Sequence, residues 1–323
     1  MDAPYQPLPP DAAREARPLA GFALVTCAVT LWALNAPVAK VILNSADVSA
    51  FRLAEVRATG SAILLMAAVL IFRPRSLRTS PRELVFLAFF GMAGLALVQF
   101  FYFVAIERLA IGIALVINAL APVLVALYAR FVSHEPVRRR IWASIGLCLA
   151  GLMLVMNVFG GVALDTIGVI ASLGSAFTYA GYVLMAEHSL KSGRDAFSLL
   201  AWGFTFSALF WAALQPWWSF PVGTVDGTAS LLGRAAEHDA PVGALLAYVV
   251  ILGTVVPFAM LVMALHYVPA TRVTIFAMLE PVLAAMVAYA WLGEELTIVQ
   301  IVGALLVLGG VALAQTARAG PAT

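Results

Sequence analysis

The sequence predicts an all-α integral membrane protein whose ten transmembrane helices form two inverted five-helix repeats. The first observation is composition: 63% of the 323 residues are hydrophobic and 11% are charged, whereas about a quarter of the residues in a soluble domain are charged. The second is a succession of apolar runs of roughly 20 residues, the length that spans a hydrocarbon core of about 30 Å. The third is that the second half of the chain repeats the pattern of the first.

The apolar runs are rich in Leu, Ala, Val and Phe and lack sustained alternation, which favours helices over the strands of a membrane barrel. The first run is about 22 residues long, beyond a signal-peptide core of about 7–15, and no clear cleavage site follows it. We therefore expect it to be retained. The ten predicted helices cover residues 20–42, 52–72, 84–106, 109–129, 141–158, 166–187, 197–216, 242–264, 271–292 and 297–316.

The distribution of Lys and Arg predicts a plasma-membrane or inner-membrane protein with both termini in the cytoplasm. With the N-terminus inside, 14 of the 19 Lys and Arg residues fall on the cytoplasmic side, as the positive-inside rule requires. Residues 1–18, rich in Pro and Ala and without a hydrophobic face, are predicted to be disordered. Residues 317–323 form a cytoplasmic tail, and the longest connection, about 217–240, faces outward.

An internal repeat appears at an offset of 159 residues, where residues 105–122 match residues 264–281. The predicted repeats cover residues 19–158 and 165–316. Each holds five helices, and because five is odd the second copy enters the membrane from the opposite side. Such inverted repeats are typical of transporters that work by alternating access around a cavity at the midplane of the bilayer.

Composition and motifs also exclude several functions. A net charge of +2 without basic patches gives no basis for nucleic-acid binding. The two cysteines lie in apolar stretches and the histidines lack ligand spacing, so neither a disulfide nor a metal site is expected. The chain has no phosphate-binding loop and no nucleophile elbow, so we expect no ATP-driven pump, no enzyme and no cofactor.

One stretch, residues 253–313, resembles the second repeat of the EamA-like family of the drug/metabolite transporter (DMT) superfamily. The resemblance rests on Ala264-Leu265, Pro269-Ala270, Leu279-Glu280-Pro281-Val282, Leu292-Gly293-Glu294 and Gly309-Gly310. The first half is similar to the companion repeat through Leu31-Trp32-Ala33-Leu34-Asn35, Ala121-Pro122-Val123 and Gly146 to Gly151, although Ser133-His134-Glu135 replaces the usual Leu-Gly-Glu turn. The resemblance implies a ten-helix bundle with cytoplasmic termini that transports small metabolites, commonly by export.

Three charged residues within predicted helices are candidates for coupling or for a counter-ion. Glu280 lies near mid-depth in the ninth helix, where a charge costs at least about 2.5–3.5 kcal/mol. It is either a proton or cation carrier, a partner of a substrate amine, or a structural carboxylate. Arg57 either attracts an anionic group, extends to the membrane interface or forms a structural pair within the protein. Arg272 lies about 12 Å along the axis from Glu280, too far for direct pairing within the helix.

Pro122 and Pro281 occupy matching places in the two repeats. Each removes a backbone donor and frees the carbonyl four residues earlier, at Asn118 and Ala277. We expect permanent bends at both prolines rather than moving hinges.

Polar and aromatic residues within the helices are candidates for substrate binding, with interhelix packing as the alternative for each. They are Trp32, Asn35, Gln99, Tyr102, Asn118, Tyr179 and Tyr182.

The sequence therefore predicts a secondary transporter that exports small organic metabolites such as amino acids or aromatic and amphipathic compounds. The expected partners are a small-molecule substrate, membrane lipids and, as a candidate coupling ion, protons. A monomer suffices because both repeats lie in one chain, and a dimer stays open. The alternatives are a lipid-handling membrane protein and an intramembrane enzyme without a recognisable motif.

Overall fold

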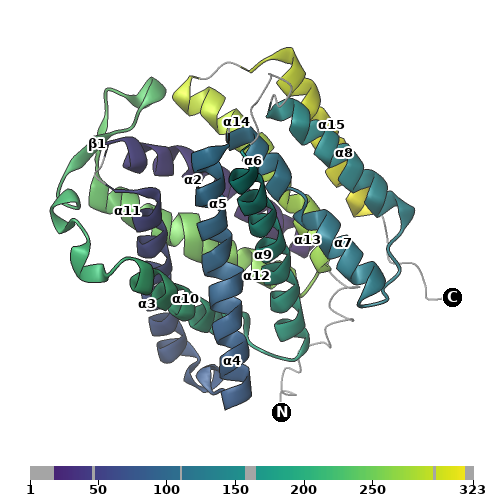
Figure 1. Ribbon diagram of the computed structural model, residues 1–323, viewed down its shortest axis with the longest axis horizontal. Helices are drawn as coiled ribbons and strands as arrows, with labels where there is room; N and C mark the ends of the chain where they lie inside the picture. Colours follow the sequence, from purple (N-terminus) through teal and green to yellow (C-terminus); the bar gives the residue numbers. More distant parts are fainter. Residues whose placement is uncertain (1–17, 46–47, 110, 157–164, 294–295, 317–323) are drawn as a thin grey trace, which may run out of the picture.

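Helices make up most of the backbone that the structure describes (Figure 1). The computed structural model describes residues 18–45, 48–109, 111–156, 165–293 and 296–316. The predicted disordered segment lies outside the described residues except for Pro18, which begins the first helix, and so do the C-terminal tail and Glu294.

The first half of the chain contains α2 (Pro18–Ser45), α3 (Ala50–Phe72), η1 (Pro74–Leu77), α4 (Pro81–Phe89), η2 (Phe90–Ala96), α5 (Leu97–Arg108), α6 (Ile111–Asn118), α7 (Ala121–Phe131) and α8 (Arg139–Val155). The second half begins with α9 (Thr166–Lys191), α10 (Ala196–Leu214), η3 (Trp217–Ser219), η4 (Val222–Thr224), β1 (Thr228–Ser230), η5 (Gly233–Ala235) and β2 (Asp239–Pro241). It ends with α11 (Val242–Val250), η6 (Ile251–Val255), α12 (Val256–Ala264), α13 (Ala270–Ala277), α14 (Glu280–Val287), η7 (Ala288–Leu292) and α15 (Ile298–Thr316).

Within the described residues, nine helical stretches are long and apolar enough to cross a membrane. They correspond to nine of the ten predicted helices, with ends that differ by a few residues. The helix predicted at 141–158 forms α8, which is 17 residues long and does not belong to the nine.

Two of these stretches are interrupted at equivalent places. The backbone leaves the helix at residues 119–120, between α6 and α7, and at residues 278–279, between α13 and α14. These positions are 159 residues apart. Pro122 and Pro281 are the second residues of α7 and α14, where a fixed φ and a missing N–H suit the first turn of a helix. Each proline therefore begins a new helical segment.

Three π-helical turns widen the backbone at η2, η6 and η7. A shift of 159 residues places η2 over residues 249–255, which include all of η6. π-turns are rare and leave the regular hydrogen-bond ladder, often at functional sites. Both lie midway along stretches that otherwise read as uninterrupted apolar helices.

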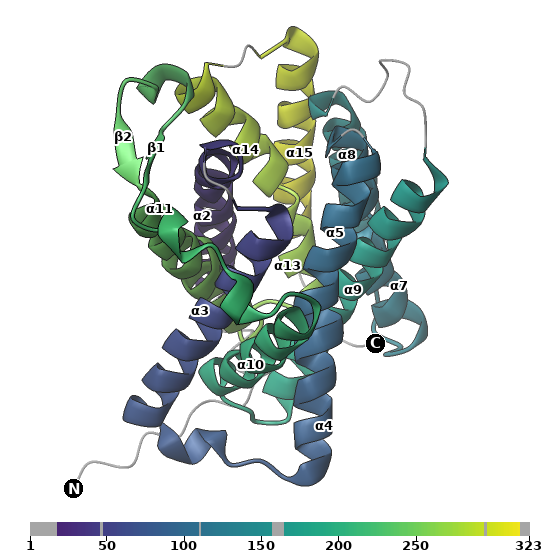
Figure 2. The same ribbon diagram turned by 60° about the vertical axis from the view of Figure 1, so that its left-hand side comes forward.

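Helices from the two halves pack against each other. In both views α8 lies alongside α15 (Figures 1 and 2), and α3 packs against α10, α5 against α9, and α2 against α12 and α14. Small residues allow the close approach of α8 and α15: a Cβ on Gly151 would lie 2.6 Å from the carbonyl oxygen of Gly303. Ser144 Oγ donates to the Gly310 carbonyl at 2.6 Å across the same contact.

Hydrogen bonds fasten α3 to the α10 region at both ends. At the beginning of α3, Arg52 pairs with Glu55 at 2.6 Å and donates to the Pro216 carbonyl at 3.2 Å. Beyond the other end of α3, Ser198 Oγ donates to the Ser76 carbonyl at 2.7 Å, and Trp202 Nε1 donates to the Leu77 carbonyl at 3.4 Å.

A two-stranded antiparallel hairpin stands in the connection between α10 and α11 (Figure 2). The sequence did not indicate it, because strands of three residues are too short to show alternation. The hairpin packs on η7: Trp291 Nε1 donates to the Leu231 carbonyl at 2.9 Å. Gly233 has a φ of +55° and lies against Leu292, where a Cβ would come within 2.5 Å of the Leu292 Cα.

Candidate functional site

Arg57 is held deep in the protein by groups from other helices. Its Nε donates to Thr254 Oγ1 at 2.9 Å, its Nη2 approaches the Gly253 carbonyl at 3.4 Å, and its Nη1 approaches Gln99 Oε1 at 3.4 Å. Thr254 Oγ1 in turn donates to the Val249 carbonyl at 2.8 Å. The guanidinium therefore binds the π-turn η6 instead of extending to the membrane interface, and the structure brings Arg57 and Gln99 together.

Glu280 is the first residue of α14, at the break that precedes it. It lies close enough to Arg57 for the two opposite charges to attract, and close enough to Tyr102 and Tyr179 for its charge to act on both hydroxyls. Among the described residues, no ion pair joins Glu280 to Arg57. The two charges thus face the same interior region from different halves of the chain without touching.

Both charged side chains are surrounded by other parts of the protein, yet both are half-buried, with part of each side chain accessible. The same partial accessibility holds for Tyr102 and Tyr179. Arg57 has hydrogen-bond partners, but the Glu280 carboxylate has no ion pair or hydrogen bond among the described residues. A buried charge without a bonded partner is costly, so access to water or to a polar solute stabilises the Glu280 carboxylate.

Asn35 closes one side of this region. Its side chain packs on the π-turn, where a Cβ on Gly253 would lie 2.2 Å from Asn35 Oδ1. Asn35 is 7% exposed, and its Oδ1 has no hydrogen-bond partner in the described structure. Buried polar atoms are nearly always paired in proteins, so an unpaired Oδ1 packed against the π-turn is an unusual polar feature of this interior region.

Aromatic rings from four helices meet next to the charged groups. Phe258 of α12 contacts Trp32, Tyr182 and Phe204, with ring centroids 5.2, 5.8 and 5.4 Å apart respectively. Tyr179 and Tyr182 lie 6.1 Å apart on α9. Tyr182 is 1% exposed, and its hydroxyl has no partner in the described structure. The predicted aromatic residues Trp32, Tyr179 and Tyr182 therefore belong to one cluster.

Two predicted residues lie elsewhere or stand alone. Asn118 ends α6 at the helix break, and its Oδ1 is buried without a hydrogen bond among the described groups. Arg272 lies in the first turn of α13, where its charge meets that of Arg138. The structure thus does not bring Arg272 to Glu280.

Sequence reasoning missed Gly253, Thr254 and Phe258. The first two form a polar, flexible pair inside an apolar run, which is a weak signal for a break in the helix. Phe258 gave no signal, because a phenylalanine within an apolar helix is ordinary. The described residues contain no group of His, Cys, Asp and Glu side chains that could hold a metal ion.

Comparison with known proteins identifies the family. The model of the EamA-like transporter family matches residues 19–157 and again residues 166–316. The threonine/homoserine exporter RhtA of Escherichia coli K12 is 27% identical over 271 residues, covering 84% of this chain and 80% of RhtA. An uncharacterized transporter of Archaeoglobus fulgidus is 27% identical over 249 residues, covering 76% of this chain and 81% of its own.

The fold also has a counterpart among solved structures. A crystal structure superposes with a TM-score of 0.74 at 18% identity, covering 94% of this chain and 96% of the other. Apolar helices of membrane-spanning length, an interior polar site and matches to transporters describe a multi-pass membrane transporter and not an enzyme. The chain belongs to the EamA-like transporter family.

Proposed function

We propose that the protein is a secondary transporter that exports small organic solutes bearing both a carboxylate and an ammonium group, such as amino acids. The observation that carries this proposal is the pair Arg57 and Glu280, which are within electrostatic reach of each other but are not joined. A zwitterion placed between them satisfies both charges. Its carboxylate pairs with a guanidinium, the donor whose planar fork matches it, and its ammonium pairs with Glu280.

The aromatic cluster supports a solute with an apolar or aromatic side chain. Trp32, Tyr179 and Phe258 offer ring faces beside the charged groups, and small-molecule sites are typically apolar with a few convergent polar groups. The similarity to a threonine/homoserine exporter supports the amino-acid class and the outward direction.

We further propose that residues 19–158 and 165–316 form two inverted five-helix repeats, with α8 as the fifth of ten transmembrane helices. Three regularities support this arrangement: the matching helix breaks, the matching π-turns, and the two separate matches of one family model. The packing supports it too. If α5 corresponds to α12 and α2 corresponds to α9, then the contact between α5 and α9 and the contact between α12 and α2 are equivalent. Alternating access then takes place around the site at the interface of the repeats.

The charge distribution supports an inner-membrane or plasma-membrane protein with both termini in the cytoplasm. In this arrangement Glu280 is the group that can exchange a proton for the substrate ammonium. The transport cycle would then be driven by the proton gradient, and one chain provides both repeats, so a monomer is sufficient.

The proposal is tested first by comparing metabolites inside cells and in the medium. The cells lack the protein, express it, or express Glu280→Gln, Arg57→Gln or the control Glu107→Gln, which removes an exposed carboxylate at the end of α5. We expect amino acids to appear in the medium with the intact protein and the control, and to be lost with the two site variants.

Proteoliposomes then test the charge requirement. A transported amino acid should compete for its own exchange at least about tenfold better than its amide or its des-amino analogue, because each lacks one of the two charged contacts. Equal competition by all three compounds, or no change in any metabolite pool with the protein confirmed in the membrane, would contradict the proposal.

A further inference from the structure

Four arginines stand between the end of α3 and the first turn of α4. Residues 73–83, here called the 73–83 connection, contain Arg73, Arg75, Arg78 and Arg82 and no lysine. All four are exposed. Arg73 pairs with Asp195 at 2.5 Å, whereas the side chains of Arg75, Arg78 and Arg82 have no hydrogen bond or ion pair in the described structure. Three guanidinium groups thus have all their side-chain donors available.

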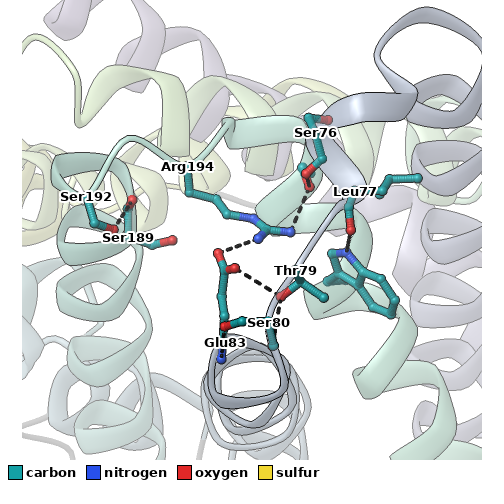
Figure 3. A network of polar contacts seen from close by, with 10 residues as sticks. Ser76, Leu77, Thr79, Ser80, Glu83, Ser189, Ser192 and Arg194 are labelled. Carbon is teal, nitrogen blue, oxygen red and sulfur yellow. Dashed lines mark hydrogen bonds and ion pairs between the residues drawn. The ribbon is translucent and has the colours of Figure 1, made fainter.

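The carboxylates near these arginines are already neutralised. Glu83, the one acidic residue of the 73–83 connection, pairs with Arg194 and accepts a hydrogen bond from Thr79 at 3.0 Å (Figure 3). Asp195 is taken by Arg73. An approaching anion therefore meets the positive charge of Arg75, Arg78 and Arg82 without an opposing free carboxylate from these two residues.

The 73–83 connection is also held in place. Arg194 Nη2 donates to Ser198 Oγ at 3.0 Å, and Ser198 Oγ donates to the Ser76 carbonyl (Figure 3). Arg194 is 6% exposed. Since these contacts fix the backbone that carries the arginines, binding to them costs less ordering entropy than binding to a loose loop.

The arginines stand beside apolar surface that has no covering protein. Ile71 and Phe72 at the end of α3, and Val85 and Phe89 on α4, are 71%, 80%, 71% and 60% exposed. Both helices belong to stretches able to span the membrane. Guanidinium groups and membrane-facing side chains therefore meet at one boundary, where the phosphate and the acyl chains of a phospholipid also meet.

We propose that the 73–83 connection is a binding site for an anionic phospholipid, whose phosphate is bound by Arg75, Arg78 and Arg82. Clusters of basic residues next to a transmembrane helix attract anionic lipids. Arginine adds directional, bidentate hydrogen bonds to phosphate that lysine lacks. If these arginines served only to orient the protein in the membrane, any positive charge would suffice and lysine could replace them. If they bind phosphate, lysine should be a poorer replacement, so the two explanations can be distinguished.

The test uses the full-length protein in detergent, titrated separately with phosphatidylglycerol and phosphatidylcholine and followed by native mass spectrometry. Wild-type protein should bind phosphatidylglycerol at least about tenfold more tightly. Replacing Arg75, Arg78 and Arg82 together by Gln should abolish this preference, and replacing them by Lys should reduce it several-fold while keeping the charge and the membrane orientation.

The matched control replaces Arg130, Arg139 and Arg140 by Gln, which removes the same charge from exposed positions around the α7–α8 connection. This control should keep the preference. The proposal is overturned if both Gln triples lose it equally, if the Lys triple behaves as wild type, or if inorganic phosphate displaces the lipid completely at equal concentration. Transport activity is not part of the readout, so the result is independent of the proposed substrate.

Discussion

At the scale of single residues, Gly253 determines how closely the first and eighth predicted helices approach. Its missing side chain leaves room for Asn35, and its carbonyl faces Arg57. A methyl group at this position would have to displace an amide oxygen 2.2 Å away, in a region packed by other helices. The polar site around Arg57 and the close contact between these two helices therefore both depend on the absence of a Cβ at Gly253.

We predict that Gly253→Ala destabilises the protein by about 1–3 kcal/mol, the usual cost of overpacking a well-packed interior. The measurement is the apparent Tm of the purified protein. Adding Asn35→Ala should restore most of the loss, because the displaced amide is then gone. Gly181→Ala is the control, since its Cβ would meet nothing closer than 3.9 Å. A double variant no more stable than Gly253→Ala would contradict this account.

The sequence identified several residues of the site but not the way in which they are held. Glu280, Arg57 and Gln99 are visible because a polar group within an apolar run requires a reason. Their mutual placement is not visible, because it depends on the π-turn η6, for which hydrophobic periodicity has no signature. Of the alternatives left open for Arg57, the structure shows hydrogen bonds within the protein, to Thr254 and Gly253 of η6, rather than an extension to the membrane interface.

At the scale of elements, the contact between α8 and α15 consists of small residues. Gly151 and Gly303 lie backbone to backbone, and Gly310 lies against Ser144 and Cys148. Between apolar helices in a membrane, such close packing replaces the hydrophobic effect as the source of association. This contact therefore holds the 17-residue helix α8 in its place.

We predict that Gly151→Ala lowers the apparent Tm, at a cost of about 1–3 kcal/mol, because its Cβ would lie 2.6 Å from a backbone oxygen that cannot move away. Gly146→Ala on the same helix is the matched control. Its Cβ would meet nothing within 4 Å, and the better helix propensity of alanine should leave the Tm unchanged or higher. Equal effects of the two substitutions would show that the contact does not limit stability.

Helix positions were predictable from the lengths of the apolar runs, and the breaks were predictable in place from Pro122 and Pro281. Whether each break would be a bend or the start of a new helix was not predictable, because a proline is compatible with both. The hairpin of residues 228–241 was not predictable either, since contacts with Trp291 and Leu292, distant in sequence, support it.

At the scale of the whole molecule, the proposed orientation places the two faces in different compartments. The hairpin and the α10–α11 connection would face outward, and the α7–α8 connection would face the cytoplasm. The charge bias that indicates this orientation is a property of the sequence, whereas helix packing alone is the same for either orientation.

The orientation is testable with single cysteines after Cys27 and Cys148 are replaced by Ala. Ala236→Cys in the hairpin and Ser133→Cys after α7 are both exposed positions. We expect a membrane-impermeant maleimide to label the cysteine at 236 in intact cells, and the cysteine at 133 only after permeabilisation. Labelling of 133 in intact cells, with 236 protected, would reverse the proposed orientation.

The hydrogen bonds that join α3 to the α10 region at both ends have a practical consequence for measurements of conformational change. Because hydrogen bonds join these two helices at both ends, neither helix can rotate away from the other about one end. We therefore expect the distance between α3 and α10 to stay constant while other helices rearrange. Spectroscopic labels on these two helices would serve as an internal ruler, against which displacements of α7 and α14 can be measured in the same sample.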